Sequence, residues 1–289
     1  MTATPTLPIE LFLQILGFVP AEEALRLRRI SRSVCEFVCS VSFAKVSLSK
    51  LTPEAADQSK RIKLLFFAPP GFQSAASMAL RALTHLQLGG SSLALTAIPR
   101  QIKALSLLTR LDLGYTGLCG QIPLELTELR HLASIRLCGN NLDGPLPESI
   151  GNWKLLHTLN LASNRFSGSL PTSTGDLPLL QHLILWENQL SGEIPIQLGK
   201  LVKLQDLFLG KNRFCGVLTD ALFRGLTNLS WVSLSDNQFT GVIPDVFGRL
   251  DSLQYLRVKG NGWSGPISEG VMTLIRSRRC DISEDCIVV

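Results

Sequence analysis

Residues 177–201 decide the fold, and they read LPLLQHLILWENQLSGEIPIQLGKL. Leu183 and Leu185 alternate with the residues around them, which is typical of a short strand with one buried face. Asn188 follows the second leucine by three residues, and Gly192 and Pro195 come after it. Glycine permits a tight bend, and proline ends it without wasting a backbone N–H group. The stretch therefore predicts a strand, a sharp turn and a return path.

The same pattern recurs along the chain at a nearly constant period. Its pairs of strand anchors are Leu86/Leu88, Leu111/Leu113, Ile135/Leu137, Leu159/Leu161, Leu183/Leu185, Leu207/Leu209, Val232/Leu234 and Leu256/Val258. Successive pairs lie 24 or 25 residues apart. Parallel neighbouring strands need a connection of a dozen or more residues, and this period supplies a strand and its return. The repeats predict a right-handed α/β solenoid with a parallel sheet.

An asparagine follows the strand in six of the eight units. These residues are Asn140, Asn164, Asn188, Asn212, Asn237 and Asn261, with Ser91 and Thr116 at the same place in the first two units. An asparagine side chain both donates and accepts hydrogen bonds. Turned inward, it can satisfy the backbone groups left open where the chain leaves the strand. We expect the six asparagines to form a structural ladder inside the solenoid.

The full unit, LxxLxxLxLxxNxLxGxIPxxLGxL, resembles the plant-type leucine-rich repeat over residues 80–267. That resemblance implies a curved, twisted horseshoe whose concave sheet faces a protein or peptide ligand. Two units depart from the pattern, one by an extra residue before Ile98 and one by Thr219 in place of proline, and irregular turns are expected there. Residues 46–79 are expected to be a linker and N-terminal cap, and residues 268–289 a C-terminal cap.

Residues 1–45 lie outside the repeats and are expected to form a small all-helical module. The motif Leu7-Pro8-x-Glu10-Leu11 and the run from Ala24 to Arg32 resemble an F-box. In that family the module docks on the small adaptor of cullin-based ubiquitin ligases. The resemblance places these residues in or beside the adaptor surface: Leu7, Pro8, Leu11, Ile15, Leu16, Leu25 and Leu27. The alternative is a helical cap that only closes the first repeat.

Composition and charge exclude several classes of protein. Hydrophobic residues make up 45% and charged residues 18% of the 289, as in a globular chain. The net charge of +5 is not gathered in a basic run, so no nucleic-acid partner is expected. No apolar run reaches the ~20 residues of a membrane span. The first basic residue is Arg26, which does not fit a secretory signal, so we expect a cytoplasmic or nuclear protein.

Nothing in the sequence indicates catalysis, a cofactor or a metal. The four histidines show no metal-ligand spacing and accompany no nucleophile motif. His182 and Asp206 share a column of neighbouring units and predict an exposed ion pair. Cys280 and Cys286 could close a small loop in a secreted protein, or remain free thiols in a reducing compartment. We therefore expect a binding protein rather than an enzyme.

The candidate ligand site lies in units five to eight, where the positions flanking the strand anchors are large or basic. The residues are Ile184, Trp186, Phe208, Lys211, Trp231, Tyr255, Arg257 and Lys259. Aromatic residues and arginine are the usual anchors of interfaces. The alternative is that they pack on one another across the strands and stabilise the sheet.

The two resemblances together predict the substrate receptor of a ubiquitin ligase, with a ligand that has apolar and acidic features. Two other classes stay open. One is an extracellular receptor-like or inhibitor protein, and the other is an intracellular repeat scaffold without a ligase role.

Overall fold

The computed structural model describes residues 65–66, 73–74, 76–77, 80–90 and 95–282. The chain divides into two compact units, one of Met1–Leu83 with Leu95–Leu107 and one of Thr84–Ala94 with Leu108–Val289. In the first unit the short helix η1 (Arg100–Ala104) is described, and Leu65 and Ile102 are fully buried. The helical module expected at residues 1–45 lies outside the described residues, and so do residues 91–94 of the irregular turn expected before Ile98.

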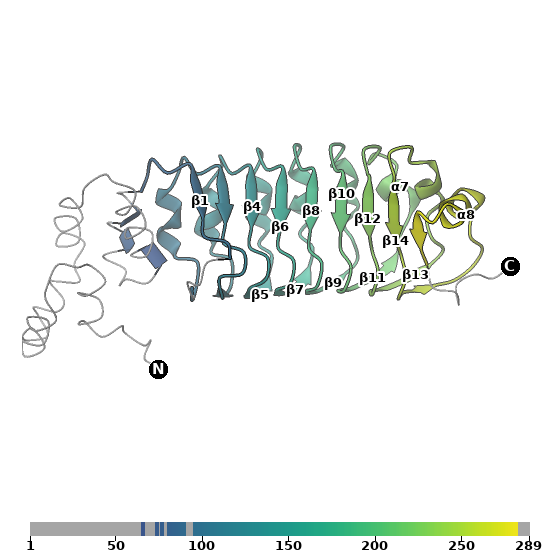
Figure 1. Ribbon diagram of the computed structural model, residues 1–289, viewed down its shortest axis with the longest axis horizontal. Coiled ribbons are helices and arrows are strands. Elements are labelled where there is room, and N and C mark those ends of the chain that lie inside the picture. Colours follow the sequence, from purple (N-terminus) through teal and green to yellow (C-terminus); the bar gives the residue numbers. More distant parts are fainter. Residues whose placement is uncertain (1–64, 67–72, 75, 78–79, 91–94, 283–289) are drawn as a thin grey trace, which may run out of the picture. The chain divides into compact units, whose positions relative to one another are not determined.

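The second unit is built on a nine-stranded parallel sheet with the order β1-β2-β4-β6-β8-β10-β12-β14-β16 (Figure 1). Its strands are β1 (His85–Gln87), β2 (Arg110–Asp112), β4 (Ser134–Arg136), β6 (Thr158–Asn160), β8 (His182–Ile184), β10 (Asp206–Phe208), β12 (Trp231–Ser233), β14 (Tyr255–Arg257) and β16 (Cys280–Asp281). The first eight strands are those that the repeat period predicts. The leucine-rich-repeat solenoid is confirmed for these residues.

The register of this sheet aligns equivalent residues of successive repeats. His182 pairs with Asp206, which pairs in turn with Trp231, and Ile184 pairs with Phe208. The middle residue of each strand points into the core, as Leu183 and Leu207 do with no exposed surface. In the eight predicted strands the residues on either side of it lie on the opposite face and are partly or fully exposed, except the buried Ser233 of β12. One face of the sheet is therefore a grid whose columns follow from the repeat period.

A second parallel sheet of seven strands was not foreseen from the sequence. Its strands are β3 (Cys119–Gly120), β5 (Asn141–Pro145), β7 (Arg165–Ser169), β9 (Gln189–Gly192), β11 (Arg213–Val217), β13 (Gln238–Gly241) and β15 (Gly262–Trp263). These residues follow the asparagine and have the composition of a turn. Gly192, at the end of β9, has a φ of 77°, a conformation that residues other than glycine rarely adopt.

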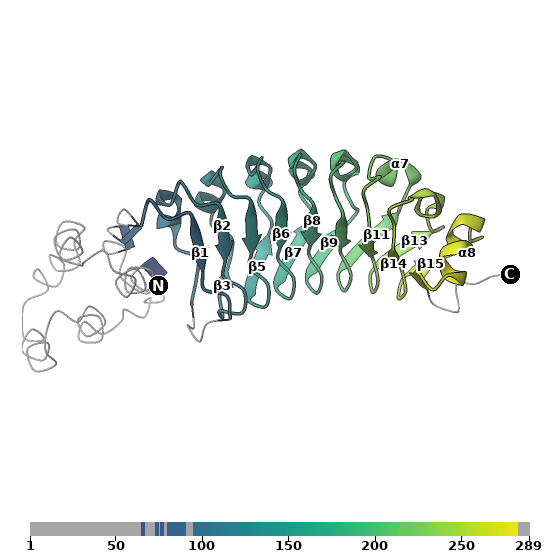
Figure 2. The ribbon, with the colours of Figure 1, turned by 45° about the horizontal axis from the view of Figure 1, so that its top comes forward.

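The return path of most repeats is a single turn of 3₁₀ helix, and these turns lie in a row in Figure 2. They are η2 (Leu124–Glu128), η3 (Glu148–Asn152), η4 (Thr172–Asp176), η5 (Ile196–Lys200) and η6 (Asp245–Arg249). Each begins after a proline. The sixth repeat instead forms α7 (Asp220–Phe223) after Thr219, whose φ of −112° lies outside the range of proline. The irregular turn expected at Thr219 is confirmed.

The asparagine ladder is present as predicted. In Asn212 the amide nitrogen donates to the carbonyl oxygens of Leu185 and Leu209 at 2.9 and 3.0 Å, and the amide oxygen accepts from the backbone of Leu190 at 3.0 Å. The same pattern holds at Asn140, Asn164, Asn188, Asn237 and Asn261. Each asparagine thus joins its own repeat to the preceding one.

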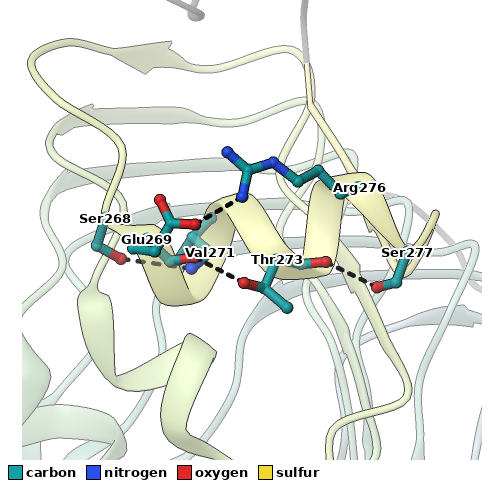
Figure 3. A network of polar contacts seen from close by, with 6 residues as sticks. All are labelled: Ser268, Glu269, Val271, Thr273, Arg276 and Ser277. Carbon is teal, nitrogen blue, oxygen red and sulfur yellow. Dashed lines mark hydrogen bonds and ion pairs between the residues drawn. The ribbon is translucent and has the colours of Figure 1, made fainter.

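The C-terminal end of the second unit is covered by α8 (Glu269–Arg276), which buries Val271 and Leu274. Ser268 caps this helix by accepting a hydrogen bond from the backbone of Val271 at 3.4 Å (Figure 3). Arg276 donates to Glu269 at 2.6 Å on its exposed side. The chain then adds β16 to the nine-stranded sheet, a strand that the sequence did not predict within the expected cap.

Cys280, in β16, carries a free thiol. Burial, with a smaller contribution from Asp281, raises the pKa of this thiol to about 12. It is therefore fully protonated at neutral pH, and the thiolate that reacts in disulfide exchange is scarce. Cys286, the partner of Cys280 in the disulfide alternative, lies outside the described residues.

Candidate ligand-binding site

The large residues predicted for the ligand site converge on one pocket of about 330 Å³ on the outer face of the nine-stranded sheet. It is lined by Ala162, Ile184, Trp186, Phe208, Trp231, Val232, Ser233, Tyr255 and Arg257. These residues come from β6 to β14 or from the positions that follow their strands. We call this group the aromatic pocket. Six of the eight predicted site residues line it, and its walls are mostly carbon.

The aromatic rings of the pocket are held in place by contacts with one another and with cations. The rings of Trp231 and Tyr255 lie 5.5 Å apart between centroids, and the guanidinium carbon of Arg257 lies 5.1 Å from the Tyr255 ring. The packing across strands that the sequence left as an alternative therefore exists. Trp231 is nevertheless 44% exposed, so the pair remains open to a ligand.

Basic side chains stand at the margin of the pocket. The ammonium group of Lys211 lies 4.6 Å from the centre of the Trp186 ring, a cation–π contact. Lys211 and Lys259, the two predicted site residues that do not line the pocket, are both exposed. Arg257 is also exposed. The margin of the aromatic pocket therefore carries positive charge.

His182 and Asp206 form the pair that their shared column predicts. The Nδ1 atom of His182 lies 2.6 Å from a carboxylate oxygen of Asp206. The pair is less exposed than expected, with 32% and 24% of the two side chains accessible. Trp231 occupies the next position of the same column. The pair links the adjacent strands β8 and β10, which also carry Ile184 and Phe208 of the aromatic pocket.

A second depression, of about 510 Å³, lies on the same face toward the first repeats. Its lining is more polar and consists of Gln87, Arg110, Leu111, Asp112, Ala133, Ser134, Arg136, His157 and Thr158. We call it the arginine depression. The sequence analysis expected the ligand site in units five to eight and did not single out these residues. The signal that could have found it is two arginines on neighbouring strands, at the start of β2 and the end of β4.

No metal or membrane site is found in the described part of the chain. Among those residues, no three histidine, cysteine or acidic side chains are grouped as a metal ion would need. None of the helices described there has the length and apolar character to cross a bilayer.

Family comparisons match both parts of the sequence. The F-box domain matches residues 5–45, and leucine-rich repeats match residues 131–153, 155–177, 179–201 and 199–262. The chain carries an F-box domain and leucine-rich repeats. Both are interaction modules without catalytic groups of their own. No curated protein matches the chain in sequence.

Solved structures resemble the repeat region. The plant peptide hormone receptor RGFR1, in complex with RGF2, is 26% identical over 72% of this chain and 40% of its own, with a TM-score of 0.60. The Arabidopsis receptor kinase HAESA, in complex with the peptide hormone IDA and the co-receptor SERK1, is 36% identical over 62% of this chain and 30% of its own, also at 0.60. A plant ice-binding protein is 27% identical over 68% of this chain and 62% of its own, with a TM-score of 0.58. The F-box and repeat chain thus spans less than half the length of the two receptors.

Proposed function

We propose that the chain is a substrate receptor of a cullin-based ubiquitin ligase, acting in the cytoplasm or nucleus. In this function residues 1–45 bind the small adaptor through Leu7, Pro8 and the other residues of the F-box motif. The repeats of residues 80–267 bind the protein to be modified. The F-box match at residues 5–45 supports the first half of the proposal, and the geometry of the repeats supports the second.

The observation that carries the recognition half is the aromatic pocket with its basic margin. A pocket lined by carbon but open to solvent leaves aromatic surface in contact with water, which binding would remove. Phe208 lies on β10 and Trp186 lies two residues after β8, and the backbone carbonyl of each accepts a hydrogen bond from the preceding repeat, so little backbone entropy is lost on binding. The pocket suits a protein segment with an apolar anchor, and Lys211, Arg257 and Lys259 suit acidic residues beside that anchor.

The structural relatives support a peptide-like ligand. Two of them are receptors solved with bound peptide hormones. Their similarity to the repeats also favours the alternative of an extracellular receptor-like protein. Adaptor binding separates the two functions, because an extracellular receptor has no use for a ligase adaptor.

The adaptor half is tested by co-purifying the full chain with the small adaptor of cullin-based ligases. We expect the wild-type chain to bind and Leu7→Ala with Pro8→Ala to abolish binding, since apolar contacts at an interface centre carry most of its free energy. Thr4→Ala with Thr6→Ala is the matched control in the same segment and should bind normally. A wild-type chain that does not bind the adaptor contradicts the ligase function and leaves the recognition half standing.

A further inference from the structure

The arginine depression is a charged surface that the proposed function does not use. Arg110 begins β2 and Arg136 ends the neighbouring β4, and both are exposed. Within the described residues, neither guanidinium has a hydrogen bond or an ion pair. The one carboxylate in the lining, Asp112, accepts a hydrogen bond from the backbone of Gly114 at 3.1 Å. The depression therefore holds two cations against one anion and keeps a net positive charge.

The two arginines are placed to act on the same group. Arg110 pairs with Ser134 and Arg136 pairs with Asp112, so the arginines are diagonal neighbours on adjacent strands. A strand separation of about 4.8 Å and two residues along the strand put their α-carbons about 8 Å apart. Arginine side chains are long enough to bind one group between them across that distance, and both line the depression. Gln87, Ser134 and Thr158 add uncharged donors around them.

We infer that the arginine depression is a second subsite that binds an anionic group, a carboxylate or a phosphate, of the same ligand whose apolar anchor fills the aromatic pocket. Paired guanidinium groups are suited to such oxyanions because their N–H groups form charge-assisted, bidentate hydrogen bonds. This inference rests on the proposed recognition function, because it assigns a second contact to the same ligand.

The sheet fixes the distance between the two subsites. Three strand spacings separate Arg136 on β4 from Phe208 on β10, and four separate Arg110 on β2 from Phe208. At about 4.8 Å each, the subsites lie about 14 to 19 Å apart. An extended peptide covers that distance in about four to six residues. Strand β6 lies between Arg136 and Phe208 and presents the smaller side chains Thr158 and Asn160, followed by Ala162.

The test is a selection of random dodecapeptides, displayed on phage, against the full chain. We expect the selected peptides to share a large apolar residue and an acidic residue about four to six positions away. Arg110→Gln with Arg136→Gln should remove the acidic preference and weaken the selected peptides about tenfold or more, with the apolar preference kept. Arg165→Gln with Arg213→Gln, on β7 and β11 of the other sheet, makes the same change of charge and should have no effect.

Synthetic versions of the best peptide, with glutamate, phosphoserine or serine at the acidic position, distinguish a carboxylate from a phosphate ligand. The peptide with serine should bind most weakly. Whichever of the other two binds more tightly identifies the anionic group that the subsite prefers. Peptides with an apolar anchor but no acidic preference, or peptides unaffected by Arg110→Gln with Arg136→Gln, overturn the second subsite alone. A selection that yields no peptide dependent on Trp186 and Phe208 contradicts the recognition function itself, and this inference with it.

Discussion

At the scale of single residues, the asparagine that follows six of the predicted strands both donates and accepts hydrogen bonds with the backbone. Asn212 donates to carbonyl groups of two different repeats, Leu185 and Leu209, and accepts from the backbone of Leu190. Aspartate lacks the donors, and leucine has neither donor nor acceptor. Without the amide, these backbone groups would face the core without partners. The ladder therefore stabilises the turn and also joins neighbouring repeats.

We expect Asn212→Ala to lower the free energy of unfolding by about 1–3 kcal/mol, because buried backbone groups lose their partners. Asn152→Ala is the matched control, since Asn152 is exposed in η3, and its effect should stay within about 0.5 kcal/mol. Urea denaturation measures both changes. Equal midpoints for the two variants would contradict the stabilising role of the ladder.

At the scale of elements, the return-path helices pack backbone against backbone. A β-carbon built on Gly175 in η4 would lie 2.2 Å from the carbonyl oxygen of Gln197 in η5. The obstacle is main chain and cannot rotate away. This glycine belongs to the LGxL end of the repeat pattern, where its role is close packing rather than a turn. The close approach of η4 and η5 therefore depends on a residue without a side chain.

Gly175→Ala should destabilise the solenoid by about 1–3 kcal/mol, because the added methyl group overpacks the contact between η4 and η5. Asp176→Ala, at the next and exposed position, should leave stability nearly unchanged. The thermal midpoint followed by circular dichroism measures the difference. A Gly175→Ala variant as stable as the wild type would show that the helices separate without cost.

At the scale of the whole molecule, the proposed adaptor and ligand surfaces lie far apart in the sequence. The F-box match ends at residue 45, whereas the aromatic pocket is built from residues 162–257. The pocket belongs to one compact unit, and residues 1–45 belong to the other. Because each unit has its own internal contacts, we expect the two binding activities to be separable by mutation.

Trp186→Ala with Phe208→Ala should abolish binding of peptides selected on the wild-type chain, each anchor contributing about 2 kcal/mol or more. Adaptor binding and the thermal midpoint should hardly change. Leu155→Ala with Val202→Ala removes apolar side chains that are 45% and 52% exposed elsewhere in the repeats, and serves as the control. A large fall in the midpoint with peptide affinity intact would instead make the aromatic cluster a purely structural one.

The repeat period, the strand anchors, the register columns and the asparagine ladder could all be derived from the sequence. Each is a property of one unit repeated at a fixed interval. The stacking of neighbouring units in register buries Leu183, Leu207 and Asn212. The candidate residues of the aromatic pocket followed from the same columns. Stacking of nearly identical units turns a local pattern into a spatial one, and this explains why so much was predictable.

Only the tertiary structure decided the second sheet, the ninth strand and the two depressions. Segments such as Arg213–Val217 become strands because the turns of adjacent repeats align, and nothing within one unit indicates it. The strand β16 pairs directly with β14, although β15 and α8 separate the two strands in the sequence. The depression that Arg110 and Arg136 share and the partial burial of His182 and Asp206 were also seen only in the structure. Contacts between units depend on how closely their backbones stack, and the sequence of a single repeat does not determine that distance.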